Sequence, residues 1–526
     1  MRYLRLALAS AITASLLAAC SGVNSGSPVS SGSQMPPTVR QAKLPKFLRL
    51  GHTPPRPPRH THMITAAMRN RAKAGGWTPV TQVAPWSNGA GSEIQMTDGT
   101  ILVQDYCTPN WYPLIPDKNG SYINGTWGPK TSMPSSYGPL YFSSAILPDG
   151  KLIVQGGEYN FCVGAETALG AIYDPVAGTW TSVTGPSGWG EIGDAQNVVL
   201  ANGTYMLGNC CNASQALLDE ANMTWTIVGS GKHDANSEEG WTLLRTGKVL
   251  TADVEQEPAA ELYSPKSEGW SLTGSVPVNL TQSVEIGPQT MMANNTVYTV
   301  GADQYTATYH PNSGKWTQGP NNPLVGATQY DAADAPTSLM PNGEGIIPES
   351  PGVYSTPAQF FLFNEKKFKT IANPPDAIND SSYNVRLLVL PTGQVLEDDG
   401  SNDVEVYSAK GAPVKGTTPA ITSVPSTVSH GNTYTISGKR FNGISQTNFY
   451  GDDDTQATNY PLVRITNTGS GTVTYARTHG FSYMGIGSNR KVSAMFDVPS
   501  GIPTGASTVQ VVTNGIASSP VSVTVK

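Results

Sequence analysis

Cysteine, histidine and charged residues are all scarce in this chain. Its 526 residues include five cysteines and seven histidines, and 13% of them are charged. No CxxC pattern and no cysteine–histidine cluster occurs, so the sequence does not indicate a zinc site. No acidic residue precedes Glu93, yet the formal net charge is −6. The part after Glu93 is therefore distinctly acidic, which argues against nucleic acid as a partner.

The chain also begins with an apolar run too short to span a bilayer as a helix. Leu6 to Leu17 follows Arg2 and Arg5 and leads into LAAC, which ends at Cys20. This pattern predicts a processed export signal over residues 1–20. It resembles a lipobox, which implies lipidation at Cys20. The lipid would anchor the protein to a membrane of the bacterial cell envelope, and the outer membrane is the expected one. The alternative is a cysteine that follows Ala-Ala by chance.

Residues 21–74 have the composition of a tether. They are rich in Ser, Gly and Pro, they carry nine basic residues between Arg40 and Lys73, and a helix is expected over 63–73. Two interpretations stay open: a solvated linker, or a segment that adheres to an anionic envelope surface.

One module of about 44 to 53 residues recurs seven times after the tether, a period typical of kelch-type propeller blades. Each copy has two apolar runs joined by a tight turn, and such turns are strong hairpin signals. The turns are Asp98-Gly99, Asp149-Gly150, Asn202-Gly203, Thr246-Gly247, Asn294-Asn295, Asn342-Gly343 and Thr392-Gly393. The closing strands carry Trp127, Trp180, Trp225, Trp270, Trp316 and Phe368.

The seventh copy has no closing strand of its own, whereas a spare one, GGWTPV around Trp77, precedes the first copy. We therefore predict that Trp77 completes the last blade and closes the ring. The predicted fold class is all-β: a seven-bladed kelch-type β-propeller over 75–411, followed over 412–526 by an immunoglobulin-like (early-set) β-sandwich of about seven short strands.

Four cysteines remain after Cys20, and an exported chain meets an oxidising compartment. Cys107 and Cys162 follow second strands of neighbouring blades, so they could pair as a disulfide. A bridge between the adjacent Cys210 and Cys211 would be a strained ring, which makes it either redox-labile or absent.

The stretches YFSSAILPDGKLIVQGGEY, SSYNVRLLVLPTGQVL and RFNGISQTNFYGDDDTQATNYPLVRIT resemble the galactose oxidase and glyoxal oxidase group. The chain looks most like a bacterial, oxidase-like lipoprotein branch of that group. The resemblance implies a copper site with two tyrosines, two histidines and a cysteine cross-linked to one tyrosine. Tyr141 matches the cross-linked tyrosine and Tyr383 the axial one, and both are catalytic candidates only if the protein is an oxidase.

The other positions of that copper site depart from the family pattern. Asn384 stands where the first histidine belongs, Gly91 lies near the cysteine position, and Thr455 or Gln456 takes the place of the second histidine. Tyr159 falls near the stacking tryptophan, and His479 is the one histidine in a suggestive C-terminal loop. Copper binding at neutral pH depends on imidazole nitrogens, so copper is not expected.

Residues just before each first strand should line one mouth of the propeller channel. They are Glu93, Tyr141, Asp194, Glu239, Glu285, Asp334 and Tyr383, and Gln196, Glu238 and Asn384 lie beside them. Three interpretations stay open for the carboxylates: they cap loop amides, they hold a hard cation such as calcium, or they bind a polyol or sugar together with the tyrosines. Asp452–Asp454 is either a solvated turn or a further cation ligand.

Two classes of function follow. The first is a non-catalytic, envelope-anchored module that binds glycan or protein or serves as a scaffold. The second is a divergent oxidase of carbohydrates, small alcohols or aldehydes, or a metal-assisted carbohydrate-active enzyme. The missing ligands at Asn384, Gly91 and Thr455 favour the first class.

Overall fold

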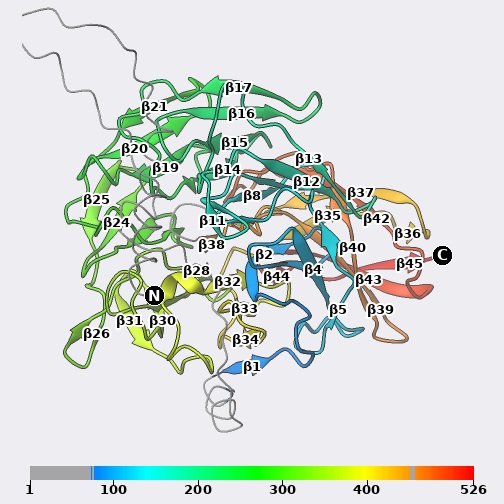
Figure 1. Cartoon of the computed structure of the whole chain (residues 1–526). Helices are drawn as coiled ribbons and strands as arrows, with labels where there is room; N and C mark the ends of the chain where they lie inside the picture. Colours follow the sequence, from blue (N-terminus) through cyan, green and yellow to red (C-terminus); the bar gives the residue numbers. More distant parts are fainter. Residues whose placement is uncertain (1–72, 74–75, 450–455) are drawn as a thin grey trace, which may run out of the picture. The chain divides into compact units, whose positions relative to one another are not determined.

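The computed structural model describes residues 73, 76–449 and 456–526, and its fold is all-β (Figure 1). One short 3₁₀ helix, η1 (Ser382–Asn384), accompanies the strands. The described residues belong to one compact unit, and they include no helix long and apolar enough to cross a membrane. The predictions for residues 1–72, for Asp452–Asp454 and for Thr455 fall outside the described residues.

Seven antiparallel sheets of four or five strands follow one another over residues 77–407 of the described chain, as many as the sequence repeats predict. Two small sheets accompany them: β7 (Pro139–Leu140) with β10 (Tyr159–Asn160) and β11 (Val163–Gly164), and β26 (Leu324–Val325) with β27 (Thr328–Gln329). Each of the seven larger sheets has the strand order of a propeller blade. The first strands are β2 (Ala90–Gln95), β8 (Ser143–Ile146), β14 (Asn197–Val199), β18 (Thr242–Leu243), β22 (Gln289–Met291), β28 (Thr337–Leu339) and β32 (Arg386–Val389). The second strands are β3 (Ile101–Asp105), β9 (Leu152–Gln155), β15 (Tyr205–Gly208), β19 (Val249–Ala252), β23 (Val297–Val300), β29 (Gly345–Glu349) and β33 (Val395–Asp398).

The outer half of each blade contains its third and fourth strands. The third strands are β4 (Asn110–Ile115), β12 (Gly170–Asp174), β16 (Gln215–Asp219), β20 (Ala260–Ser264), β24 (Thr306–His310), β30 (Gln359–Asn364) and β34 (Glu405–Tyr407). The fourth strands are β5 (Thr126–Trp127), β13 (Thr179–Ser182), β17 (Thr224–Val228), β21 (Gly269–Leu272), β25 (Lys315–Gln318), β31 (Lys367–Thr370) and β1 (Trp77–Pro79). Every predicted closing aromatic lies in a fourth strand.

The predicted tight turns join the first and second strands of all seven blades. The second residue of each turn has a positive φ, from 72° at Asn295 to 96° at Gly203. The first residue of each pair does not have a positive φ, so each turn ends on a left-handed residue, a position that favours glycine or asparagine. The repeat read from the sequence is therefore confirmed at each hairpin.

The last blade is completed by the N-terminal strand, as predicted. Trp77 of β1 pairs with Tyr407 of β34 in an antiparallel register. Its fully buried ring meets Phe360 edge-on at 5.2 Å, and its indole nitrogen donates to the carbonyl of Ala372 at 2.7 Å. The first strands of the first and last blades, β2 and β32, also lie side by side.

Residues 420–526 form two further sheets, in agreement with the predicted sandwich. The first sheet contains β35 (Ala420–Ser423), β37 (Thr433–Lys439), β42 (Lys491–Asp497) and β41 (Thr478–His479). The second contains β36 (Thr427–Val428), β45 (Val521–Val525), β43 (Gly505–Thr513), β39 (Leu462–Asn467), β40 (Val473–Ala476) and β44 (Ile516–Ala517). We call this part the C-terminal domain.

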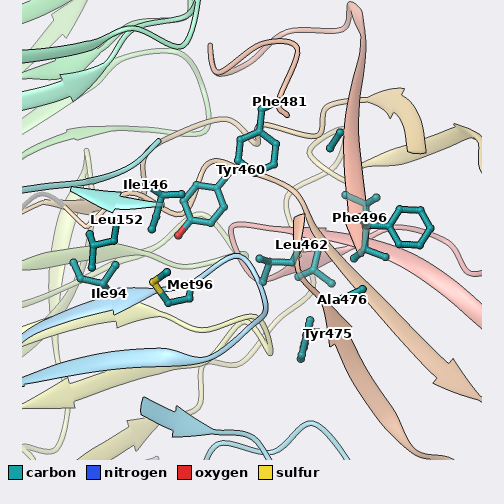
Figure 2. Packing of buried hydrophobic residues seen from close by; sticks show 14 of the residues in the cluster. Ile94, Met96, Ile146, Leu152, Tyr460, Leu462, Tyr475, Ala476, Phe481 and Phe496 are labelled. Atoms are coloured by element: carbon teal, nitrogen blue, oxygen red, sulfur yellow. The ribbon is translucent and has the colours of Figure 1, made fainter. Parts of the chain in front are cut away.

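The C-terminal domain and the first two blades share one hydrophobic core (Figure 2). Ile94 and Ile146 of the blades belong to the same cluster as Tyr460 and Phe481. The Tyr460 hydroxyl also donates to the carbonyl of Gln95. Burial of apolar surface is the main favourable term in folding, so this shared core couples the two parts.

The C-terminal domain covers the end of the blades that carries the tight turns, which we call the hairpin end. A Cβ on Gly99 would lie 2.6 Å from the ring of Tyr475, so only glycine allows this approach. Strand β38 (Asn448–Phe449) pairs with the first strand β28, and Asn448 accepts from the amide of Val389 in the next blade at 2.9 Å. The candidate site therefore belongs to the opposite end, which we call the loop end.

Candidate functional site

The loop end collects two sets of loops from every blade. First and second strands are antiparallel, so the loop before a first strand and the loop after a second strand lie at the same end. Several residues that enter the first strands have left-handed backbone, with φ of 52° at Tyr141, 58° at Glu238, 63° at Val284 and 48° at Asp334. This conformation is strained for residues other than glycine, and such strain clusters at functional sites.

Three buried carboxylates from consecutive blades meet at the loop end. Glu238, Glu285 and Asp334 place carboxylate oxygens within 4.8 Å of one another. We call these three residues the axial acidic group. The Tyr354 hydroxyl donates to Glu285 Oε1 at 2.6 Å and lies 3.4 Å from Asp334 Oδ2.

Two half-buried tyrosines stand beside the axial acidic group. The ring of Tyr383 meets that of Tyr354 edge-on, with centroids 4.8 Å apart. The site therefore combines buried oxygen acceptors with aromatic surface that stays partly accessible. Glu285, Asp334 and Tyr383 were predicted for this mouth and Glu238 was placed beside it, whereas Tyr354 was missed.

Glu239, which was also predicted for this mouth, is not part of this group; its carboxylate lies with those of Asp253 and Glu261 instead. Its carboxylate lies 3.0 Å from the Lys232 ammonium, which also pairs with Glu261 at 2.5 Å. Burial alone would lower the pKa of Lys232, but the charges of Glu239 and Glu261 outweigh burial and raise it. Glu239 thus belongs to a buried ion-pair network inside the fourth blade.

Glu93 lies apart from the axial acidic group as well, between the first and last blades. It is fully buried near Asp398, and burial together with that neighbouring charge raises the pKa of Glu93 well above its ordinary value. Burial likewise raises the pKa of Asp398 to about 8. The Arg386 guanidinium opposes both shifts, and it donates to the carbonyl of Tyr383 at 2.9 Å.

The two tyrosines that the resemblance assigns to a copper site belong to one cluster. Tyr141 packs with Tyr106 and Tyr159, and Tyr383 borders the same group. The Tyr159 ring meets that of Tyr141 at 6.1 Å, and the Arg386 guanidinium lies over the Tyr141 ring at 5.5 Å. Tyr106, which was missed, is buried, and its pKa is raised by burial and by Tyr383.

The residues present do not fit a copper-radical centre. Cys107 and Cys162, the cysteines that pack in the Tyr141 cluster, are joined in a disulfide, so neither offers a free thiol for a tyrosine cross-link. Asn384 ends the 3₁₀ helix beside Tyr383, and Gly91 lies against the side chain of Gln104. We therefore derive no reaction step through copper.

Histidine is not available from the described residues around Tyr141 and Tyr383. His479 lies in strand β41 of the C-terminal domain, not in a loop of the site, and contacts Asp497 at 3.1 Å. Gln456 is buried, and its backbone carbonyl accepts from the side-chain amide of Asn448, which also accepts from the amide of Val389 in the last blade. His233 contacts Asp253 in the fourth blade.

Asp194 lies at the loop end of the third blade, next to a second disulfide. Cys210 and Cys211 are joined to each other, so this bridge is formed and not absent. Their sulfurs lie close to the carboxylate of Glu166. Gly193, which precedes Asp194, has φ of 68° and leaves room for Glu166 and Cys210, since a Cβ there would lie 2.3 Å and 2.5 Å from them.

No protein-family model and no curated protein matches this sequence. Solved structures are similar in fold at low identity. A fungal alcohol oxidase of the AA5 family in complex with copper is 14% identical, with 85% of this chain and 100% of that chain covered and a TM-score of 0.46. Virginiamycin B lyase from Staphylococcus aureus is 8% identical, with coverages of 64% and 100% and a TM-score of 0.44. The WD40 propeller domain of Doa1 is 12% identical, with coverages of 64% and 98% and a TM-score of 0.41. We transfer no residue role from these structures.

Proposed function

We propose that this protein is an envelope-anchored lipoprotein whose propeller binds a hydroxyl-rich ligand, a glycan or glycan-bearing envelope partner, without copper-radical chemistry. The observation that carries the proposal is the axial acidic group with Tyr354 and Tyr383 beside it. The resemblance to oxidases supports the fold and not the activity, because one fold hosts many functions.

The chemistry of this site suits a polyol. Carboxylate oxygens accept hydrogen bonds from sugar hydroxyls, and such bonds to charged groups are stronger than neutral ones. Tyr354 and Tyr383 are half-buried, so each offers part of a ring face and a hydroxyl. Binding sites commonly combine apolar or aromatic walls with a few convergent polar groups.

A double substitution of the axial acidic group tests this function. We expect Glu285→Gln with Asp334→Asn to weaken glycan-array binding by about tenfold or more, since hydrogen bonds to charged groups contribute about 1.5–3 kcal/mol each. The melting temperature should hold or rise slightly, because two crowded negative charges are removed. The matched control is Glu349→Gln, a buried carboxylate of the sixth blade outside the group. Unchanged binding together with a lower melting temperature would instead assign the carboxylates to loop capping.

A divergent oxidase is the second candidate, because Tyr141 and Tyr383 border one cluster as the resemblance implies. The same purified protein is offered alcohols, aldehydes and sugars, with and without copper, while hydrogen peroxide is measured. We expect no peroxide above the level of a Tyr141→Phe variant. Peroxide formation that is lost in this variant would replace the binding function by the oxidase.

Membrane attachment has its own test, on a residue outside the described part of the chain. We expect Cys20→Ala to move the protein from the membrane fraction to the soluble fraction, because acyl chains supply most of the anchoring free energy. A Cys20→Ala protein that still sediments with membranes would point to the basic tether as the anchor.

A further inference from the structure

We propose a calcium site at the loop end of the seventh blade, formed by Asp376, Asp380 and Asp399. All three side chains are buried, and their carboxylate oxygens lie within 4.8 Å of one another. This separation is about twice a typical Ca²⁺–oxygen distance of about 2.4 Å, so one ion can contact all three. The site is separate from the axial acidic group and shares no residue with it.

Two segments of the chain bring these residues together. Asp376 and Asp380 lie in the connection between β31 and η1, which links the sixth blade to the seventh. Asp399 directly follows the second strand β33. A bound ion would therefore join the crossover between two blades to a loop of the second one.

Glu397 supplies the independent observation that points to a ligand. It is 1% exposed, and neither of its carboxylate oxygens has a hydrogen-bond partner. Glu397 precedes Asp399 by two residues, and its carboxylate is near enough to those of Asp399 and Asp380 for their charges to act on it. A buried carboxylate without a hydrogen bond is costly unless a cation or a proton neutralises it.

Further negative charge lies around Glu397. Glu405 stands directly opposite it on β34, and like charges in such a cross-strand pair are destabilising.

The donor chemistry selects the kind of ion. Every side chain assigned to the site is a carboxylate, and oxygen ligands suit hard cations such as Ca²⁺. One carboxylate oxygen of Asp399 already accepts from the amide of Ser401 at 2.9 Å, which orients the group. Since η1 with Tyr383 begins two residues after Asp380, the ion would also hold the loop that carries Tyr383 of the axial site.

The test uses calcium alone and the purified full-length protein. We expect about one Ca²⁺ per chain by atomic emission, a lower melting temperature after chelation, and recovery when Ca²⁺ is restored. Asp380→Asn with Asp399→Asn should weaken Ca²⁺ binding by at least about 100-fold, since even residues behind the ligands change metal affinity by 10–100-fold. In chelator this variant should melt no lower than the wild-type protein, because its charge repulsion is relieved.

Two matched variants locate the ion. Glu349→Gln, which removes a buried carboxylate elsewhere, should keep the full response to Ca²⁺. Glu285→Gln with Asp334→Asn should keep it as well. A wild-type protein that holds no Ca²⁺ and melts at one temperature with and without chelator would overturn the proposal, even if the site variants fail to fold. Loss of the Ca²⁺ response only in the axial variant would move the ion to the axial acidic group.

Discussion

Trp77→Ala should lower the free energy of unfolding by about 3–5 kcal/mol, the usual effect of truncating a buried tryptophan. The substitution would both leave a cavity and weaken the strand that closes the ring. Trp77 is fully buried against Phe360 and Tyr407, and its strand, which precedes the first blade in sequence, completes the last blade. Thermal or denaturant unfolding of the purified protein measures the loss.

The matched control for this substitution is Trp225→Ala. Trp225 also lies in a fourth strand, β17, but it is only half-buried. Unlike β1, strand β17 directly follows the other three strands of its blade in the sequence. Its replacement should therefore cost less. Deletion of residues 75–82 goes further: it exposes the edge of β34, so we expect aggregation in size-exclusion chromatography. A deleted protein that stays monomeric with an unchanged melting temperature would contradict ring closure by this strand.

Lys232→Met is the second substitution with a large expected effect, a loss of about 3–5 kcal/mol, because it leaves two carboxylates buried without their cation. The Lys232 side chain is 1% exposed between Glu239 and Glu261. Replacing both carboxylates by glutamine in the same protein should recover much of the loss. The control is Lys151→Met, whose partner Asp149 lies at the surface, where ion pairs contribute about 0–1 kcal/mol.

The loss from Lys232→Met should depend on pH with a defined sign. Burial raises the pKa of Glu239 above its ordinary value, and the Lys232 charge opposes this shift. Without Lys232 the folded state therefore binds protons more tightly than the unfolded state, and its stability falls as pH rises. The variant should be closest to the wild-type protein at acidic pH and furthest from it at neutral pH. An equal loss at both pH values would show that packing, not charge, is responsible.

The fold was predictable because its signals are local and repeated. Each Asn-Gly or Asp-Gly pair needs a positive φ that few residues adopt, so the turns mark the hairpins directly. The spare strand around Trp77 was predictable by elimination, since the seventh repeat lacked a closing aromatic. These features depend on backbone geometry, which the sequence expresses at fixed spacing.

The candidate site was predictable only in part, because loops carry no such spacing. Glu285 and Asp334 were found from their place before first strands. Glu238 and Glu239 are adjacent, and the sequence does not show which of the two joins them; in the structure it is Glu238, whose backbone is left-handed. Tyr354 follows a second strand and lies outside the set of positions that the repeat defines. The pairing of Glu239 with Lys232 depends on tertiary contact alone.

The pairing that closes the ring is expected to form late in folding. The indole of Trp77 bonds a carbonyl 295 residues away, and that of Trp86 bonds one 315 residues away. Contacts between such distant segments form slowly, because the entropy of closing the long loop must be overcome first. The first six blades can form from strands that are near one another in sequence, whereas the last blade needs strands from both ends of the propeller sequence. Strand β1, which precedes every blade in sequence, is therefore expected to be the last strand of the propeller to pair.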